Sequence, residues 1–287
     1  MKRRNFLQSA ALAGSAALLA PNAIAETLRR ERIKEFGFQA YTVRDFIYKD
    51  MPSTLKRLRK AGFDFMEGFD FGGGKLLQKP ISEAKEILKD QKMGIKSLHI
   101  MTGNLNNTWE QDIDDAADLG AEYIACAYLM PNERESIDQY KALTELFNKC
   151  AEKAKSAGIQ FAYHNHDFEF QELDGQLPMD VILSETDEDL VKIELDIYWA
   201  RRAGINPLTF FRDNLKRVPL WHVKDLSMAE GQPMTEVGNG IIDWEQIFKH
   251  KDDSGMKYFF VEQDANFQED SLSSLETSIK HLKKLYY

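Results

Sequence analysis

The chain has 287 residues, of which 43% are apolar and 29% are charged, and its formal net charge is -9 at pH 7. This length suits one large α/β domain, because barrels of about 250 residues are common. The acidic balance argues against a nucleic-acid partner and against an anionic membrane surface, since both favour a basic footprint. Cys126 and Cys150 are the only cysteines, so neither a disulfide framework nor a thiolate metal site is expected.

Residues 1–25 are predicted to be a cleavable export signal. The segment opens with paired arginines in Lys2-Arg3-Arg4, and the apolar stretch Ala10–Ala20 that follows is too short to span a bilayer. Ala23-Ile24-Ala25 matches an A-x-A cleavage pattern. The segment resembles a twin-arginine signal, with an ordinary secretory leader or a disordered tail as alternatives. We therefore expect a periplasmic or otherwise exported protein, with residues 26–34 as a linker.

From residue 35 onward, short apolar runs alternate with amphipathic helical patterns. The runs that predict strands are Phe36–Tyr41, Phe63–Glu67, Ile95–Ile100, Tyr123–Tyr128, Phe161–Glu169, Ile193–Asp196, Leu220–Asp225 and Phe259–Asp264. The predicted helices are Pro52–Ala61, Ile81–Lys92, Thr108–Leu119, Ile137–Ala157, Met179–Ser184, Pro207–Asn214, Trp244–Lys249 and Leu272–Leu285. Alternating strand–helix units imply a parallel sheet, and eight of them favour a closed (β/α)8 barrel over residues 35–287. Gly72-Gly73-Gly74 follows no nucleotide-binding pattern and is predicted to be a loop.

Polar side chains concentrate at the ends of the predicted strands. They are Gln39, Tyr41, Arg44, Glu67, His99, His164, His166, Glu169, Asp196, His222, Lys224, Asp225 and Glu262. The active site of a (β/α)8 barrel lies where its strands end, so these groups are expected to converge. Taken singly, His99 also fits a hydrogen-bonded core histidine and Glu67 a solvated loop residue. As a set, they would bury uncompensated charge, which predicts one divalent metal ion such as Mn, Mg, Co or Zn.

Asp196, His222 and Glu262, which end the last three strands, are predicted metal ligands. The fifth strand leaves a choice for the fourth ligand. Glu169 is our prediction, because a short loop can return it to the site, and His164 at the strand end is the alternative. His164 and His166 are two residues apart, so both can face one side of the strand.

Several motifs resemble one known family. They are Phe38–Asp45 (FQAYTVRD), Tyr163–Phe170 (YHNHDFEF), Trp221–Asp225 (WHVKD) and Val261–Asp264 (VEQD). Together they are similar to the xylose-isomerase-like barrels, also called the sugar phosphate isomerase/epimerase family, over about residues 35–285. The resemblance implies a divalent metal held by Glu, Asp, His and Glu from strands five to eight. At the fifth strand the family's usual Glu position is His164, which moves the role of base toward a histidine or toward Glu169.

The resemblance also implies a reaction, namely sugar isomerisation or epimerisation by removal of a proton next to a carbonyl. The metal would act as a Lewis acid toward the enediolate. Glu262 is expected both to bind the metal and to take part in proton transfer, with His164 or His166 as its counterpart. The residues expected to bind substrate oxygens are Gln39, Glu67, His99 and Lys224.

Two alternative functions stay open. Relatives of this subgroup use the same intermediate on 3-keto-glycosides, where proton loss at C2 expels the C1 substituent, as in a lyase or hydratase. A non-catalytic, metal-dependent carbohydrate-binding protein would keep the ligands and lose the base, and the group His164, His166, Lys224 and Glu262 argues against it. Because an exported enzyme would rarely meet sugar phosphates, we expect a non-phosphorylated carbohydrate. The oligomeric state is left open between a monomer and a homodimer.

Overall fold

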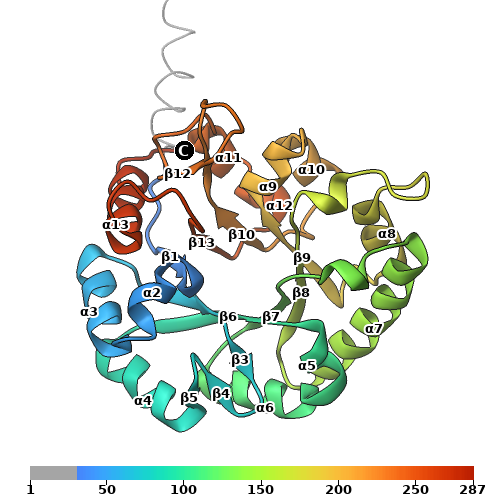
Figure 1. Ribbon diagram of the computed structural model, residues 1–287, viewed down its shortest axis with the longest axis horizontal. Helices are drawn as coiled ribbons and strands as arrows, with labels where there is room; N and C mark the ends of the chain where they lie inside the picture. The colour runs from blue at the N-terminus through green and yellow to red at the C-terminus, as the bar shows by residue number, and fades with distance from the viewer. Residues whose placement is uncertain (1–30) are drawn as a thin grey trace, which may run out of the picture.

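The computed structural model describes residues 31–287, which form a closed eight-stranded parallel barrel surrounded by helices (Figure 1). The barrel strands are β1 (Gly37–Gln39), β2 (Phe65–Gly68), β6 (Gly94–Ile100), β7 (Tyr123–Cys126), β8 (Gln160–His164), β9 (Val191–Asp196), β10 (Leu220–Val223) and β13 (Tyr258–Val261). Their order around the barrel follows the chain, and β1 closes it by pairing with β13, as in Gly37 with Phe260. The predicted (β/α)8 barrel is therefore confirmed.

The predicted helices are present with shifted ends. The longer ones are α3 (Met51–Ala61), α4 (Ile81–Gln91), α6 (Trp109–Leu119), α7 (Ile137–Ser156), α8 (Pro178–Glu185), α10 (Pro207–Asp213), α11 (Trp244–Lys249) and α13 (Ser271–Leu282). Local signals set their ends. The Asp50 side chain caps α3 at its start, and Gly62 ends it in the left-handed conformation, with φ of 108°. The last helix ends at Leu282, three residues before the predicted Leu285.

Short helical turns lie between these elements. They are η1 (Ala40–Val43), α2 (Arg44–Ile47), α5 (Thr102–Asn107), η2 (Pro131–Glu133), η3 (Phe168–Phe170), α9 (Ile197–Arg202) and α12 (Lys251–Ser254). Several begin where a longer strand was predicted. The first strand stops at Gln39 because its side-chain oxygen accepts a hydrogen bond from the N–H of Tyr41 and starts η1. Polar residues predicted at strand ends therefore lie partly on turns at the barrel mouth.

Residues 71–80 form a small antiparallel sheet that the sequence reading missed. Its strands are β3 (Phe71–Gly72), β4 (Lys75–Leu76) and β5 (Lys79–Pro80), inserted between β2 and α4. The prediction of a plain loop at Gly72–Gly74 is wrong in part, since Gly72 belongs to β3 and pairs with Lys75. Buried Asp112 on α6 accepts a hydrogen bond from the N–H of Gly73 at 2.7 Å, which fastens the insertion to the barrel wall. A second hairpin, β11 (Asp225–Leu226) with β12 (Met234–Thr235), follows β10.

The barrel interior is layered. A small apolar cluster of Phe65, Ala125, Ala162, Leu220 and Phe260 is separate from the main core between strands and helices. Inward-facing residues recur every second position along a strand. Two residues beyond these apolar positions, the same strands carry polar groups: Glu67, His164, His222 and Glu262. The fold thus stacks a polar layer directly on an apolar layer.

The two ends of the described chain meet at one edge of the domain. Arg32 forms an antiparallel bridge with Tyr286, and the N–H of Glu31 donates to the carbonyl of Tyr287 at 2.8 Å. Part of the predicted linker is thus held against the C-terminus. The predicted signal at residues 1–25 lies outside the described residues. Within residues 31–287 no helix has both the length and the apolar character needed to cross a membrane.

Asp225, one of the polar strand-end residues, supports the fold. Its buried carboxylate accepts four N–H groups: the backbone groups of Leu226, Gly238 and Ile242 and the indole of Trp244. Hydrogen bonds to a buried charge are costly to leave unmade. We therefore expect Asp225→Ala to lower the free energy of unfolding by about 3 kcal/mol, measured by urea denaturation.

The control for this change is Asp213→Ala, since Asp213 is exposed at the end of α10. We expect it to shift the free energy of unfolding by less than about 0.5 kcal/mol. Equal stability of Asp225→Ala and the wild type would show that the hairpin after β10 does not depend on this carboxylate.

Candidate active site

The structure brings His164, Asp196, His222 and Glu262 together at the barrel mouth. One ligand atom from each lies within 4.8 Å of all the others, and all four side chains are buried. His164 Nε2 lies 3.4 Å from Asp196 Oδ2, and His222 Nδ1 lies 2.5 Å from Glu262 Oε2. Outside the set itself, the polar contacts to these four atoms come from the Lys224 ammonium, at 2.8 Å from Asp196 Oδ2 and 2.7 Å from Glu262 Oε2. Two imidazoles and two carboxylates this close together fit a divalent ion such as Zn, Mn or Co. We call this set the upper group.

Neighbouring contacts orient each donor of the upper group. His164 Nδ1 lies 3.0 Å from the carbonyl oxygen of Ala127, which must accept its N–H, so Nε2 carries the free lone pair. Asp196 begins α9, and its Oδ1 accepts the N–H of Trp199 at 3.0 Å. That cap leaves Oδ2 of Asp196 turned toward the other donors.

Glu169 does not join the upper group, contrary to our prediction. One of its carboxylate oxygens accepts the hydroxyl of Tyr163, and the other accepts the N–H of His166 at 2.8 Å. The side chain is fully buried, and this burial raises the pKa of Glu169 to about 7. Glu169 therefore holds the turn after β8, and His164 is the fifth-strand residue that lies with Asp196, His222 and Glu262.

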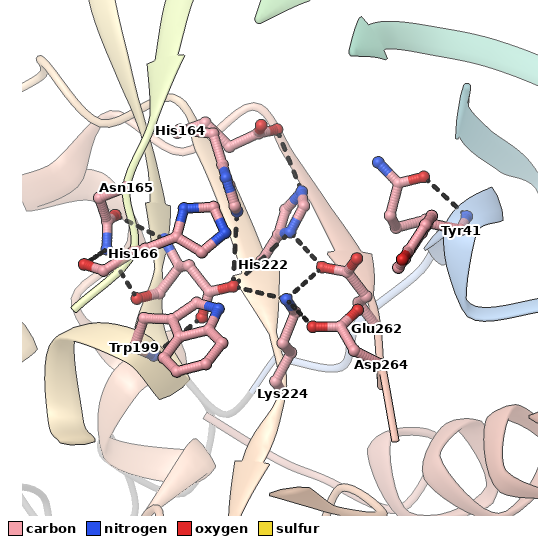
Figure 2. Close-up of polar contacts among 12 residues, drawn as sticks. Tyr41, His164, Asn165, His166, Trp199, His222, Lys224, Glu262 and Asp264 are labelled. Carbon is pink, nitrogen blue, oxygen red and sulfur yellow. Dashed lines mark hydrogen bonds and ion pairs between the residues drawn. The ribbon is translucent and has the colours of Figure 1, made fainter. Parts of the chain in front are cut away.

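Lys224 is buried beside the upper group (Figure 2). Its ammonium lies 2.8 Å from Asp196 Oδ2, 2.7 Å from Glu262 Oε2 and 2.9 Å from Asp264 Oδ2. Burial alone would lower the pKa of Lys224, but the three carboxylates outweigh it and raise the pKa well above its usual value. Burial and then Glu262 raise the pKa of Asp264 to about 6. The predicted role of Lys224 in substrate binding is compatible with its place on the cavity wall.

Beneath this layer lies a second set of polar groups, Glu67, His99, Glu194 and His222, which we call the lower group. Glu67 Oε2 lies 2.6 Å from His222 Nε2, and Glu194 Oε2 lies 2.6 Å from His99 Nε2. His222 thus belongs to both groups, with Nε2 facing down and Nδ1 facing up. A carboxylate that accepts the Nε2 proton leaves Nδ1 as the metal-binding nitrogen.

Two predicted substrate-binding residues lie too deep for that role. Gln39 and Glu67 are fully buried and do not line the cavity, whereas His99 does. The Gln39 amide donates to Glu67 Oε2 at 2.7 Å, so both serve to orient His222. Burial raises the pKa of Glu67 to about 7. Glu194 was not predicted as a site residue, although it shares an inward face with Asp196 two positions later.

His166 occupies a different environment on the same wall. Its ring stacks on Phe168 at 5.4 Å between centroids and contacts Tyr128 and Trp199. Its Nδ1 is buried and makes no hydrogen bond. Burial and then His164 lower the pKa of His166 to about 2, so the imidazole is neutral near pH 7. A pKa this low makes the imidazole a weak base, so a part in proton transfer requires negative charge nearby that raises it.

A cavity of about 830 Å³ reaches the upper group at His164 and Glu262 and the lower group at His99. Its inner end is lined by His99, His164, His166, Lys224, Glu262 and Asp264. Its outer end is lined by residues from the loops and the inserted sheet, including Tyr41, Phe69, Phe71 and Met101. In Figure 2, Tyr41 lies apart from the cluster around Lys224. The cavity therefore has a charged floor and an apolar outer wall.

Comparison with known proteins finds inosose dehydratases among the sequences similar to this chain. An inosose dehydratase of Clostridium perfringens (strain 13 / Type A) is 29% identical over 164 residues, which is 51% of this chain and 54% of that protein. An inosose dehydratase of Clostridium beijerinckii is 27% identical over 134 residues, 41% of this chain and 44% of that protein. The chain thus spans about half the length of the curated relatives it matches.

Solved structures match nearly the whole barrel. A sugar phosphate isomerase/epimerase from Parabacteroides distasonis has a TM-score of 0.76 and 26% identity, covering 87% of this chain and 93% of that chain. The IolI protein with a bound zinc atom has a TM-score of 0.66 at 13% identity, covering 86% and 96%, and this likeness shows the fold alone. The model of the xylose isomerase-like TIM barrel matches residues 55–285. Since that match spans the barrel from α3 to α13, the chain belongs to the xylose isomerase-like TIM barrel family.

Proposed function

We propose that this protein is a divalent-metal-dependent isomerase or epimerase of non-phosphorylated sugars. It would remove a proton from carbon next to a carbonyl, through an enediolate. The observation that carries the proposal is the upper group, whose four ligand atoms are buried and lie within 4.8 Å of one another, with the Lys224 ammonium against two of its oxygens. A buried set of this kind is stable only with a cation or added protons.

His164, Asp196, His222 and Glu262 are the residues that would hold the ion. When bound, the ion would supply Lewis acidity toward the carbonyl and a neighbouring hydroxyl of the sugar. The protein's own part is to place a base and a proton donor against the same carbon. His166 and Glu262 both line the inner end of the cavity, and His166 Nδ1 has no hydrogen-bond partner, so we assign His166 the role of base on its position.

Lys224 and Asp264 complete the proposed machinery. The Lys224 ammonium lies between Glu262 and Asp264, with N–O distances of 2.7 and 2.9 Å. From this position Lys224 can donate a hydrogen bond to a substrate oxygen that gains negative charge. His99 reaches the same cavity and would bind another hydroxyl group.

The preference for a non-phosphorylated sugar rests on two observations. No arginine lines the cavity among the described residues, and its lysines are Lys75 and Lys224, the latter already surrounded by carboxylates. The expected export signal at residues 1–25 would also carry the protein away from the sugar phosphates of the cytoplasm. Both favour a neutral sugar.

A second candidate is elimination from a 3-keto-glycoside, and the inosose dehydratase relatives favour it because dehydration is an elimination. His166 would take the proton from C2, the C–H electrons would form the C1–C2 double bond, and the C1–O bond would break. The leaving oxygen would take its proton from Lys224. Isomerisation and elimination share the first step and differ in whether C1 carries a leaving group.

The first test concerns the metal. Glu67→Gln removes the charge that fixes the ring of His222, and loss of such a supporting partner typically weakens metal affinity about 10- to 100-fold. We expect a loss of this size for Mn and Zn, measured by competition with a chromophoric chelator. The matched control is Glu86→Gln, because Glu86 is exposed on α4. Unchanged affinity in Glu67→Gln would contradict the role assigned to Glu67.

The second test concerns proton transfer. In deuterated buffer the metal-loaded protein should exchange the C–H proton next to the carbonyl of its substrate, which NMR detects across a panel of free and 3-keto sugars. His166→Gln should slow this exchange by roughly 10²- to 10⁴-fold and leave the metal content unchanged. His281→Gln, on the exposed side of α13, should exchange at the wild-type rate.

The outcomes of the exchange test separate the candidate functions. Sugar binding without exchange would contradict the enzyme and favour a carbohydrate-binding protein. Exchange with release of the C1 substituent would favour elimination. Full exchange in His166→Gln would show that another group is the base.

A further inference from the structure

The cavity is larger than is needed to hold one sugar ring against the groups at its inner end. At about 830 Å³ it lies near the upper end of the range for small-molecule sites, about 300–1,000 Å³. The groups assigned to proton transfer and to substrate oxygens, His166, Lys224 and Glu262, line its inner end. One sugar ring bound at the inner end would leave the outer end unfilled. The outer end can therefore hold a second group.

The outer end has an apolar surface that faces the cavity. Tyr41 is 41% exposed and Met101 is 38% exposed, and both line the cavity with Phe69 and Phe71. Exposed apolar surface of this kind, enclosed in a concave site, is typical of a ligand contact. We call Tyr41, Phe69, Phe71 and Met101 the outer wall.

The outer wall is held in place by its own contacts. The ring of Phe69 packs edge-to-face against Tyr41 at 5.2 Å and against Tyr48 at 5.6 Å. The Tyr48 hydroxyl donates to Asp70 at 2.8 Å. The inserted sheet that carries Phe71 is fastened to α6 by the Gly73–Asp112 hydrogen bond. A rigid wall costs less conformational entropy on binding than a mobile loop.

We propose that the outer wall is a subsite for a second ring, joined to the reacting sugar through a glycosidic oxygen. The Arg44 guanidinium lies over the Tyr41 ring at 4.2 Å, so the apolar contact offered to an aromatic ring or a pyranose is the remaining exposed part of Tyr41 together with Met101. Asp70, Lys75 and Gln78 also line this end and supply polar partners for hydroxyl groups at the ring edge. The substrate is then a glycoside of two rings, not a free monosaccharide.

This inference depends on the proposed function only for placing the reacting sugar at the inner end. Elimination gives the second ring a chemical role, as the group that leaves with the glycosidic oxygen. Isomerisation of a two-ring sugar would use the same subsite for binding alone. The subsite is therefore tested by binding, separately from the reaction.

The experiment measures dissociation constants by calorimetry on the metal-loaded full chain. The ligands are methyl glucoside, phenyl glucoside and methyl cellobioside, whose anomeric carbons are all locked as acetals, so that they carry no carbonyl and bind without reacting. For the wild type we expect both two-ring ligands to bind at least about tenfold more tightly than methyl glucoside. Phenyl glucoside and methyl cellobioside separate an aromatic second ring from a sugar second ring.

Tyr41→Ala and Met101→Ala should remove most of that advantage, while the affinity for methyl glucoside stays within about twofold. Tyr286→Ala and Met228→Ala are matched controls, since both side chains are exposed and neither lines the cavity. Two-ring ligands that bind the wild type no better than methyl glucoside would overturn the subsite. So would variants that weaken all three ligands equally. Failure of proton exchange with an intact two-ring preference would overturn the proposed reaction alone.

Discussion

The structure depends on the balance of charge around the ring of His222. Glu67, Glu194, Asp196 and Glu262 are all buried within contact of one another through this ring and its neighbours. Among residues 31–287, Lys224 is the one lysine that forms ion pairs with these four carboxylates, and it pairs with Asp196 and Glu262. Burying so many carboxylates is unfavourable unless cations or protons compensate them. A divalent ion at the upper group would supply that compensation at the point where sugar chemistry needs a Lewis acid.

The two groups contact different nitrogens of the His222 ring. In the lower group, Glu67 accepts the Nε2 proton of His222 and does not line the cavity. His99 is the member of this group that lines the cavity. The upper group receives the free Nδ1 and opens to the cavity through His164 and Glu262. A rigid, buried support beneath an open ligand set is what keeps a catalytic metal site in position. The apolar cluster of Phe65, Leu220 and Phe260 lies below both groups and fixes the strands that carry them.

Much of this arrangement follows from sequence, because strand ends converge in any parallel barrel. The positions of Asp196, His222 and Glu262 at strand ends were enough to predict that these side chains lie together. The choice between His164 and Glu169 could not be predicted, because it depends on a turn in which the N–H of His166 donates a hydrogen bond to a carboxylate oxygen of Glu169. Gln39 and Glu67 were predicted to bind substrate because the alternation of side chains along a strand shows which face a residue lies on. It does not show how deep the residue lies along the barrel axis. The inserted sheet at residues 71–80 could not be predicted, because a strand of two residues is too short to show a periodic pattern.

Strands and loops carry different parts of the proposed function. The proposed metal ligands His164, Asp196 and His222 stand on β8, β9 and β10, and Glu262 directly follows β13, so hydrogen bonds across the barrel fix their spacing. The outer wall stands on the turn after β1, the inserted sheet and the start of α5, which are free to vary between relatives. In the proposed function, isomerisation and elimination share a first chemical step and differ in what the substrate carries at C1. For this chain, we propose that Tyr41 and Met101 select the substrate and that the groups below them carry out the chemistry.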